Sequence, residues 1–98
     1  MKAKELIRRR IEITERAIAD VVVWTVPAPV DGCAHLFKYR LAFVVDDECV
    51  IRYDNERGKG DHRHYGRREM AYRFSNPRQL LADFFEDIAR WRNERSDD

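Results

Sequence analysis

Residues 35–45, HLFKYRLAFVV, carry the pattern that decides the fold. Large apolar side chains occupy every second position, and basic side chains lie between some of them, which is typical of a strand with one buried face. The alternating apolar residues are Phe37, Tyr39, Leu41, Phe43 and Val45. Asp46-Asp47 follows as a short turn, and residues 48–54, ECVIRYD, return as a second strand. The stretch therefore predicts an antiparallel hairpin.

The segment before this hairpin, residues 6–26, fits two structures. Its second half, DVVVWTV, is β-branched and aromatic and stops at Pro27 and Pro29, which favours strands. We therefore predict strands at about 5–14 and 18–26, with a turn near 14–16. A helical face that starts at Leu6 and Ile7 fits almost as well, so the residues alone leave a first helix open.

The end of the chain predicts a helix. Residues 70–74, MAYRF, suggest one more strand, and Asn76-Pro77 with Gln79 then supplies a helix cap, a first-turn proline and a capping-box partner. Apolar residues recur afterwards at helical spacing, at Leu80, Leu81, Phe84, Phe85, Ile88 and Trp91. Such a helix over 77–91 must cover the apolar side of the sheet. The predicted fold class is α+β: an antiparallel β-meander of about four to five strands with one C-terminal helix packed across it.

Length and composition limit the other possibilities. The 98 residues predict one domain, 1–98, whose last residues, 93–98, form a frayed tail. The 19 basic and 18 acidic residues nearly cancel, so any nucleic-acid site must be a local patch. Cys33 and Cys49 lack metal-site spacing, the start does not resemble a signal peptide, and no apolar run is long enough to span a bilayer. We expect a cytoplasmic protein with reduced thiols and no membrane association.

Residues 52–69, RYDNERGKGDHRHYGRRE, are the candidate functional stretch. In one interpretation it is only a solvated turn, in which Gly58 and Gly60 allow positive φ and Asp54 and Asn55 bond nearby backbone. In the other it is an active site. Residues two apart in an extended segment share a face, so His62 and His64 would then address one point and divide the roles of base and acid.

The second interpretation assigns a role to each neighbour. Asp54 or Asp61 would orient an imidazole. Arg63 lies between the histidines and would point away from them in an extended segment. The candidate substrate-binding residues are Arg57, Lys59, Arg63, Tyr65 and Arg67. Cations can hold a phosphate and an aromatic ring can stack on a base, which suits metal-independent RNA cleavage by the adjacent 2′-hydroxyl.

A metal site is the competing interpretation. Two histidines at this spacing plus Asp54 or Asp61 can bind a divalent ion. A single His-x-His is a weak signal, however, no third ligand can be assigned, and the many cations disfavour a metal. We therefore predict no metal and no other cofactor.

Polar and aromatic residues elsewhere are assigned structural roles. His35 follows Gly32 and is expected to be a loop residue, and Trp24 and Trp91 are expected in the core or at its rim. The acidic helix residues are expected on its solvent-exposed side; they are Asp83, Glu86 and Asp87.

Two blocks of the sequence carry a family resemblance. YDNERGKGDHRH, followed about ten residues later by YRFSNPRQLLADFFEDI, resembles the TumE family of small toxins from prokaryotic toxin–antitoxin systems. The likeness extends to DVVVWTVPAPV and HLFKYRLAFVV, and so covers nearly the whole chain. It implies a cytoplasmic growth-inhibiting toxin encoded beside a small DNA-binding antitoxin, and it favours strands over a helix in residues 6–14.

Three hypotheses for function follow. The first is a toxin that acts as a ribonuclease through the His-x-His motif, with RNA as its target. The second is a non-catalytic binding module that inhibits growth by occupying an RNA or protein site. The third is a regulatory partner of a DNA-binding protein. A pure binder would need the cations but has no special use for two histidines, which favours the first hypothesis.

Overall fold

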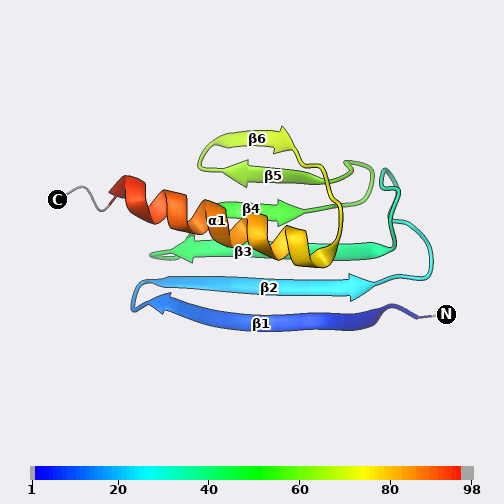
Figure 1. Ribbon diagram of the computed structural model, residues 1–98, viewed down its shortest axis with the longest axis horizontal. Helices are drawn as coiled ribbons and strands as arrows, with labels where there is room; N and C mark the ends of the chain where they lie inside the picture. Colours follow the sequence, from blue (N-terminus) through cyan, green and yellow to red (C-terminus); the bar gives the residue numbers. More distant parts are fainter. Residues whose placement is uncertain (1, 96–98) are drawn as a thin grey trace.

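The computed structural model describes residues 2–95, which form one antiparallel sheet and one helix (Figure 1). The six strands follow one another across the sheet in chain order, as a meander. Helix α1 lies diagonally across one face (Figure 1). The elements are β1 (Lys4–Thr14), β2 (Ala17–Thr25), β3 (Phe37–Val45), β4 (Glu48–Asp54), β5 (His62–Tyr65), β6 (Arg68–Ala71) and α1 (Pro77–Arg95).

The N-terminal segment is a pair of strands, as the β-branched residues and the family resemblance favoured. β1 and β2 pair antiparallel with Arg9 opposite Val21, so the alternative of a first helix is wrong. The predicted turn near residue 15 is present, because the Arg16 amide donates a hydrogen bond to Thr14 Oγ1 at 3.1 Å. Arg16 also forms an ion pair with Asp46 at 2.5 Å, which joins the first turn to the turn between β3 and β4.

The central hairpin is confirmed, including its turn. Asp46 and Asp47 have φ values of 50° and 67°. A two-residue hairpin turn with two positive φ values follows the twist of the flanking strands, and aspartate is one of the few residues that tolerates this conformation.

The number of strands is higher than the four to five predicted. β5 and β6 are two short strands joined at Gly66, whose φ is 61° and whose amide donates to Val50 O at 2.8 Å. The strand expected over 70–74 ends at Ala71. The sequence hid this hairpin because β5 carries charged or polar side chains on both of its faces, so no apolar alternation marks it.

Helix α1 packs its apolar stripe on the sheet, as predicted. Its fully buried residues are Leu80 and Phe84, each 0% exposed, and Ile88 is 3% exposed. Leu81 and Phe85 pack only at the periphery of this cluster. The buried strand residues of the core are Ala17, Ala19, Val21, Val23, Tyr39, Leu41, Phe43, Ile51 and Tyr53.

The helix cap differs in one detail from the prediction. Asn76 Oδ1 accepts the Gln79 amide at 2.8 Å, as an N-cap does. The Gln79 side chain donates forward to Asp83 Oδ1 at 2.8 Å and does not complete a capping box. The helix continues to Arg95, past the start of the expected frayed tail; positions 96–98 of that tail lie outside the described residues. No helix within residues 2–95 is both long and apolar enough to cross a membrane.

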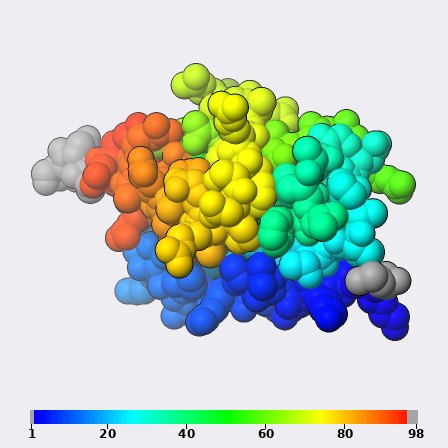
Figure 2. Space-filling model, turned by 45° about the vertical axis from the view of Figure 1, so that its right-hand side comes forward, coloured from blue at the N-terminus to red at the C-terminus, as the bar shows by residue number. Residues whose placement is uncertain are grey.

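The face of the sheet opposite α1 holds no second layer in the part of the chain that the structure describes (Figure 1). We call it the open face. Strand register assigns side chains to it: Tyr53 lies beneath α1, so its neighbours Arg52 and Asp54 point to the open face. Seen from the helix side, α1 and the segment before it cover the middle of the molecule, and the loop over residues 26–36 lies beside them (Figure 2). The histidines of β5 are thus on the uncovered side.

We predict that Phe84→Ala lowers the free energy of unfolding by about 3–5 kcal/mol, because it leaves a cavity between α1 and the sheet. Arg92→Ala, at an exposed position of the same helix, should change it by less than about 0.5 kcal/mol. Urea unfolding of both variants measures the difference. Equal stabilities would contradict the packing of Phe84 in the core.

Candidate active site on the open face

Strand pairing brings five ionisable side chains together on the open face. Asp54 of β4 lies opposite His62 of β5, and Arg52 lies opposite His64. Glu69 of β6 lies opposite His64 on the other side. The two imidazole rings are 5.3 Å apart between centroids, as expected for alternate residues of a strand. The predicted convergence of the two histidines is therefore present in the structure.

His62 is the buried member of the pair, at 5% exposure. Its Nδ1 lies 3.1 Å from Gly60 O, and because a carbonyl only accepts, Nδ1 carries a hydrogen. Its Nε2 lies 2.6 Å from Asp54 Oδ1 and 3.7 Å from Glu69 Oε2. Both ring nitrogens of His62 therefore face acceptor atoms.

The close contact of His62 with Asp54 lacks the alignment of a hydrogen bond. Within residues 2–95, His62 Nε2 and Asp54 Oδ1 are buried and have no hydrogen-bond partner, and Arg52 Nε is in the same condition. Buried polar groups are normally hydrogen-bonded. Three such atoms lie together here, because His62 and Arg52 both contact the Asp54 carboxylate without the alignment of a hydrogen bond at these atoms.

Two glycines set the backbone that holds His62. Gly60 has a φ of 73°, and a Cβ there would lie 3.1 Å from Gly32 O. A Cβ on Gly32 would meet Gly60 N at 3.0 Å, so the two loops approach too closely for side chains. The Gly58 amide also donates to Asp31 O at 2.8 Å. This contact directs the Gly60 carbonyl at the His62 ring, which is why the turn needs glycine.

His64 has a different set of partners. Arg52 Nη2 lies 2.9 Å from His64 Nε2 and Glu69 Oε2 lies 3.2 Å from it. A guanidinium only donates, so Nε2 is the acceptor in its contact with Arg52. Burial lowers the pKa of His64, and the positive charge of Arg52 lowers it further. The pair thus combines one imidazole beside a carboxylate with one whose pKa is lowered by burial and by a guanidinium.

Arg52 and Glu69 belong to this site, although the sequence pattern did not identify them. Arg52 Nε lies 3.0 Å from Asp54 Oδ2, so one guanidinium contacts both the carboxylate and His64. Its position two residues before Asp54 was an available signal, because alternate strand residues share a face. Glu69 is brought in by the turn at Gly66, which the apolar pattern of the sequence did not predict.

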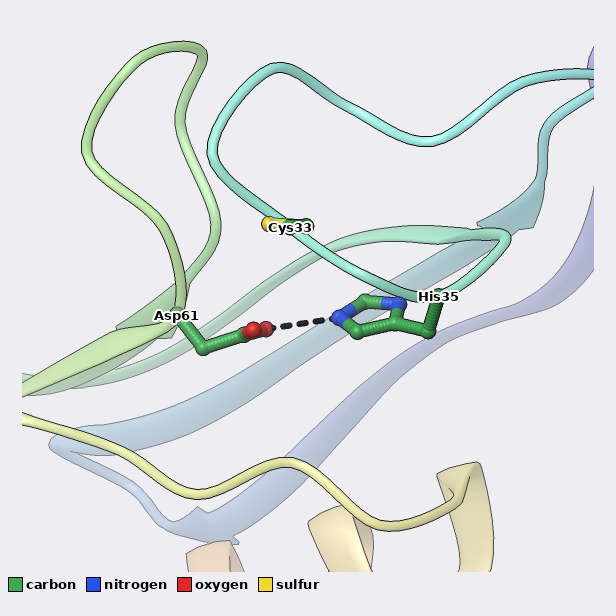
Figure 3. Close-up of side chains that lie close together, drawn as sticks. All are labelled: Cys33, His35 and Asp61. Carbon is green, nitrogen blue, oxygen red and sulfur yellow. Dashed lines mark hydrogen bonds and ion pairs between the residues drawn. The ribbon is translucent and has the colours of Figure 1, made fainter.

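Asp61 lies on the other side of the sheet from the histidine pair. Its Oδ1 accepts from the Tyr39 hydroxyl at 2.6 Å and lies 2.9 Å from His35 Nε2. Figure 3 shows this carboxylate directed at the His35 ring, with Cys33 on the same loop as His35. Burial is the main cause that raises the pKa of Tyr39 and of the Cys33 thiol, and the nearby Asp61 carboxylate raises both further. Asp54, and not Asp61, is the carboxylate beside His62.

The cluster of Cys33, His35 and Asp61 has the donor types of a metal site but the wrong tautomer. The Phe37 amide donates to His35 Nδ1 at 3.2 Å, so the hydrogen of the neutral ring is on Nε2, which faces Asp61. A metal at Nε2 would require that hydrogen on Nδ1. Phe74 stacks on the ring at 3.9 Å, so His35 is a structural loop residue, as the sequence suggested.

Arg63 and Tyr65 face α1 and not the histidines. Arg63 Nη1 donates to Tyr53 Oη at 3.0 Å and to Asp87 Oδ2 at 3.2 Å. The Tyr65 hydroxyl donates to Glu94 at 2.8 Å. Both side chains were candidate substrate contacts, but their partners hold them on the helix side of the sheet. Asp87 was expected in solvent and is 5% exposed, because it accepts from Tyr53 and Arg63.

The remaining candidate cations lie in exposed turns. Arg57 and Lys59 are in the loop between β4 and β5, where Lys59 forms a long ion pair with Glu56 at 3.8 Å. Arg67 is exposed in the turn between β5 and β6. These three residues lie in the turns at the two ends of β5, on either side of the histidine pair, and are not part of the histidine cluster.

Comparison with known families decides the class of protein. The model of the family described as Toxin TumE matches residues 2–92 of this chain of 98 residues. The chain belongs to the TumE toxin family. No curated protein and no solved structure matches it significantly. A TumE toxin role, and with it an antitoxin as partner, is therefore consistent with the resemblance of the two sequence blocks.

The histidine site of this TumE chain also has the donors for a metal. His62, His64 and Glu69 can each present one ligand atom within 4.8 Å of the others. The Arg52 guanidinium, however, lies 2.9 Å from His64 Nε2, where the metal would have to bind. A fixed cation at that point favours an anion as ligand.

We predict that the pKa of His64 in the folded protein, followed by NMR titration, lies below its ordinary value of 6.5. Arg52→Met should raise it, and Arg67→Met, in an exposed turn, should not. Folding lowers the pKa of His64, so its contribution to the stability of the folded protein is complete at pH values above the ordinary pKa. That contribution is lost as the pH falls through the pKa of His64 in the folded protein. A His64 pKa that does not respond to Arg52→Met would contradict the contact.

Proposed function

We propose that this TumE toxin is a metal-independent ribonuclease whose acid–base pair is His62 and His64. The observation that carries the proposal is the pairing of two imidazoles, 5.3 Å apart, one beside the Asp54 carboxylate and the other beside the Arg52 guanidinium. General acid–base catalysis of phosphodiester transfer needs one group that accepts a proton and one that donates a proton at the same site. A non-catalytic RNA binder has no use for that difference.

His64 is assigned as the base. In the absence of substrate its Nε2 accepts from Arg52. A substrate phosphate attracts the guanidinium, which frees Nε2 to take the proton of the 2′-hydroxyl. The 2′-oxygen then attacks the adjacent phosphorus and forms the new O–P bond.

His62 is assigned as the acid. Its protonated Nε2 gives a proton to the 5′-oxygen as the P–O5′ bond breaks. The products are a 2′,3′-cyclic phosphate and a 5′-hydroxyl, and the proton taken by His64 balances the one given by His62. Asp54, 2.6 Å from His62 Nε2, favours the charged ring before the reaction.

Arg52 and the loop cations are assigned to the phosphate. Arg52 stabilises the negative charge that develops on the phosphorane oxygens, since donors fixed at that position cost no reorganisation. Arg57, Lys59 and Arg67, at the two ends of β5, attract the flanking phosphates. Arg63, Tyr65 and Asp61 take no direct part in the proposal, because their partners hold them on the other side of the sheet.

We predict that His62→Ala and His64→Ala each reduce RNA cleavage by the purified toxin about 10²–10⁴-fold. The folds should be retained, as checked by circular dichroism, and growth inhibition in cells should disappear. Arg68→Ala, an exposed charge on the helix side of β6, is the control and should retain activity. The rate should show a bell-shaped dependence on pH.

Chelator separates this mechanism from a metal-dependent one. Cleavage should persist in EDTA, and loss of cleavage that added zinc restores would replace the proposal with a metallonuclease built on His62, His64 and Glu69. A folded double-histidine variant that still arrests growth would instead favour the binding module.

We also propose that a small DNA-binding antitoxin covers the loop of residues 55–61. Arg57 and Lys59 are exposed there, next to the buried histidine. An acidic segment of the antitoxin would neutralise this loop and exclude RNA from the site.

We predict that Arg57→Glu with Lys59→Glu weakens the toxin–antitoxin complex and flattens its dependence on salt. Isothermal titration with the antitoxin encoded beside the toxin gene measures both. The control is Arg78→Glu with Arg92→Glu, which makes the same charge change on exposed positions of α1. Equal affinity for all three toxins would place the antitoxin elsewhere.

A further inference from the structure

The open face has a hollow beside the histidine site that the proposed chemistry does not use. It encloses about 280 Å³ and is lined by Lys38, Tyr39, Arg40, Asp54, Asn55 and Glu56. Asp54 forms one wall, so the hollow adjoins the carboxylate that contacts His62. It is therefore continuous with the site where the phosphodiester would react.

Two cations in this hollow lack partners. Other basic residues on the open face are paired: Arg8 with Glu5, Arg10 with Asp20, and Arg52 with Asp54. Lys38 and Arg40 are exposed, and in the described chain neither side chain makes an ion pair or a hydrogen bond. Their positive charge is available to a ligand from solvent.

Register fixes the distance of these cations from the reaction. Arg40 lies opposite Asp54, and Asp54 lies opposite His62. Adjacent strands are about 4.8 Å apart, so Arg40 and His62 start from backbones about 10 Å apart. That separation suits a contact of Arg40 with the next phosphate along a strand.

A second hollow extends the same path. It encloses about 360 Å³, shares Lys38 and Glu56 with the first, and reaches Arg57 in the loop between β4 and β5. Trp24 lies opposite Lys38 on β2 and is half-buried on the same face. Cations in line with an aromatic ring at a flat sheet face are typical of single-stranded RNA binding.

We propose that Lys38 and Arg40 form a phosphate subsite for the nucleotides that flank the cleaved bond. A single RNA strand leaves the histidines, crosses β4 and β3 over these two side chains, and continues toward Arg57. This inference rests on the proposed function and makes the preferred substrate a single strand longer than a dinucleotide.

Two substrates test the subsite. Lys38→Ala with Arg40→Ala should lower kcat/KM for a ten-nucleotide single-stranded RNA and leave cleavage of a ribodinucleotide unchanged, because the dinucleotide does not reach β3. The control, Arg78→Ala with Arg92→Ala, removes the same charge from α1 and should behave as the unmodified toxin on both. Loss of activity on the dinucleotide as well would mean that the pair acts at the reacting centre and would overturn the subsite.

Binding separates failure of the subsite from failure of the proposed function. A toxin with both His62→Ala and His64→Ala binds a fluorescent ten-nucleotide RNA without cleaving it. Removing two phosphate contacts from that protein should reduce the slope of log affinity against log salt by about 1.4. An unchanged slope overturns the subsite even if the histidines cleave RNA, and a reduced slope supports it even if they do not.

Discussion

The register between β4 and β5 is the constraint on which the rest of the structure depends. With Tyr53 opposite Arg63, one set of side chains faces α1 and the alternate set faces the open side. A slip of one residue would exchange the two sets and place Arg63 where the histidines now lie. The buried contacts on the helix side prevent that slip, because Arg63 reaches Asp87 and Tyr53 there. A buried charge that lost its partner would be strongly destabilising.

The same register explains why the two histidines differ. Both come from one short strand, yet each is opposite a different residue of β4: His62 meets the carboxylate of Asp54, and His64 meets the guanidinium of Arg52. Burial and then the Arg52 charge lower the pKa of His64, whereas His62 lies beside a carboxylate. The difference in partners therefore arises from strand pairing, and the loop adds the Gly60 carbonyl as a contact of His62.

The sequence predicted the parts of this arrangement that depend on period two. The strand character of residues 37–54, the shared face of His62 and His64, and the outward direction of Arg63 all follow from alternation along one strand. Arg52 and Asp54 also share that period, but only pairing with β5 shows what they meet. Partners that come from other elements carry no local signal, which is why Asp87 beneath Arg63 and the contact of Asp61 with His35 were missed.

The short strands show a second limit of sequence patterns. Apolar alternation does not mark a strand when one of its faces carries a polar cluster and the other forms hydrogen bonds with a helix. β5 is such a strand, since its histidines face the open side while Arg63 and Tyr65 bond residues of α1. The absence of an apolar pattern in β5 therefore reflects polar partners on both faces, which only the fold could show.

The glycine-bearing loop has a mechanical role as well as an electrostatic one. Asn55 is 1% exposed; its side chain accepts the Tyr39 amide at 2.9 Å and donates to Phe37 O at 2.7 Å, so it replaces the strand residue that would otherwise pair with this end of β3. The chain can then leave the sheet immediately after Asp54 without unsatisfied backbone groups. It returns at Gly60, whose carbonyl holds the His62 ring. The residues that look like an ordinary turn in the sequence thus position the buried imidazole, and the structural interpretation is confirmed for Gly58, Gly60 and Asn55, while catalysis by the histidines is a proposal.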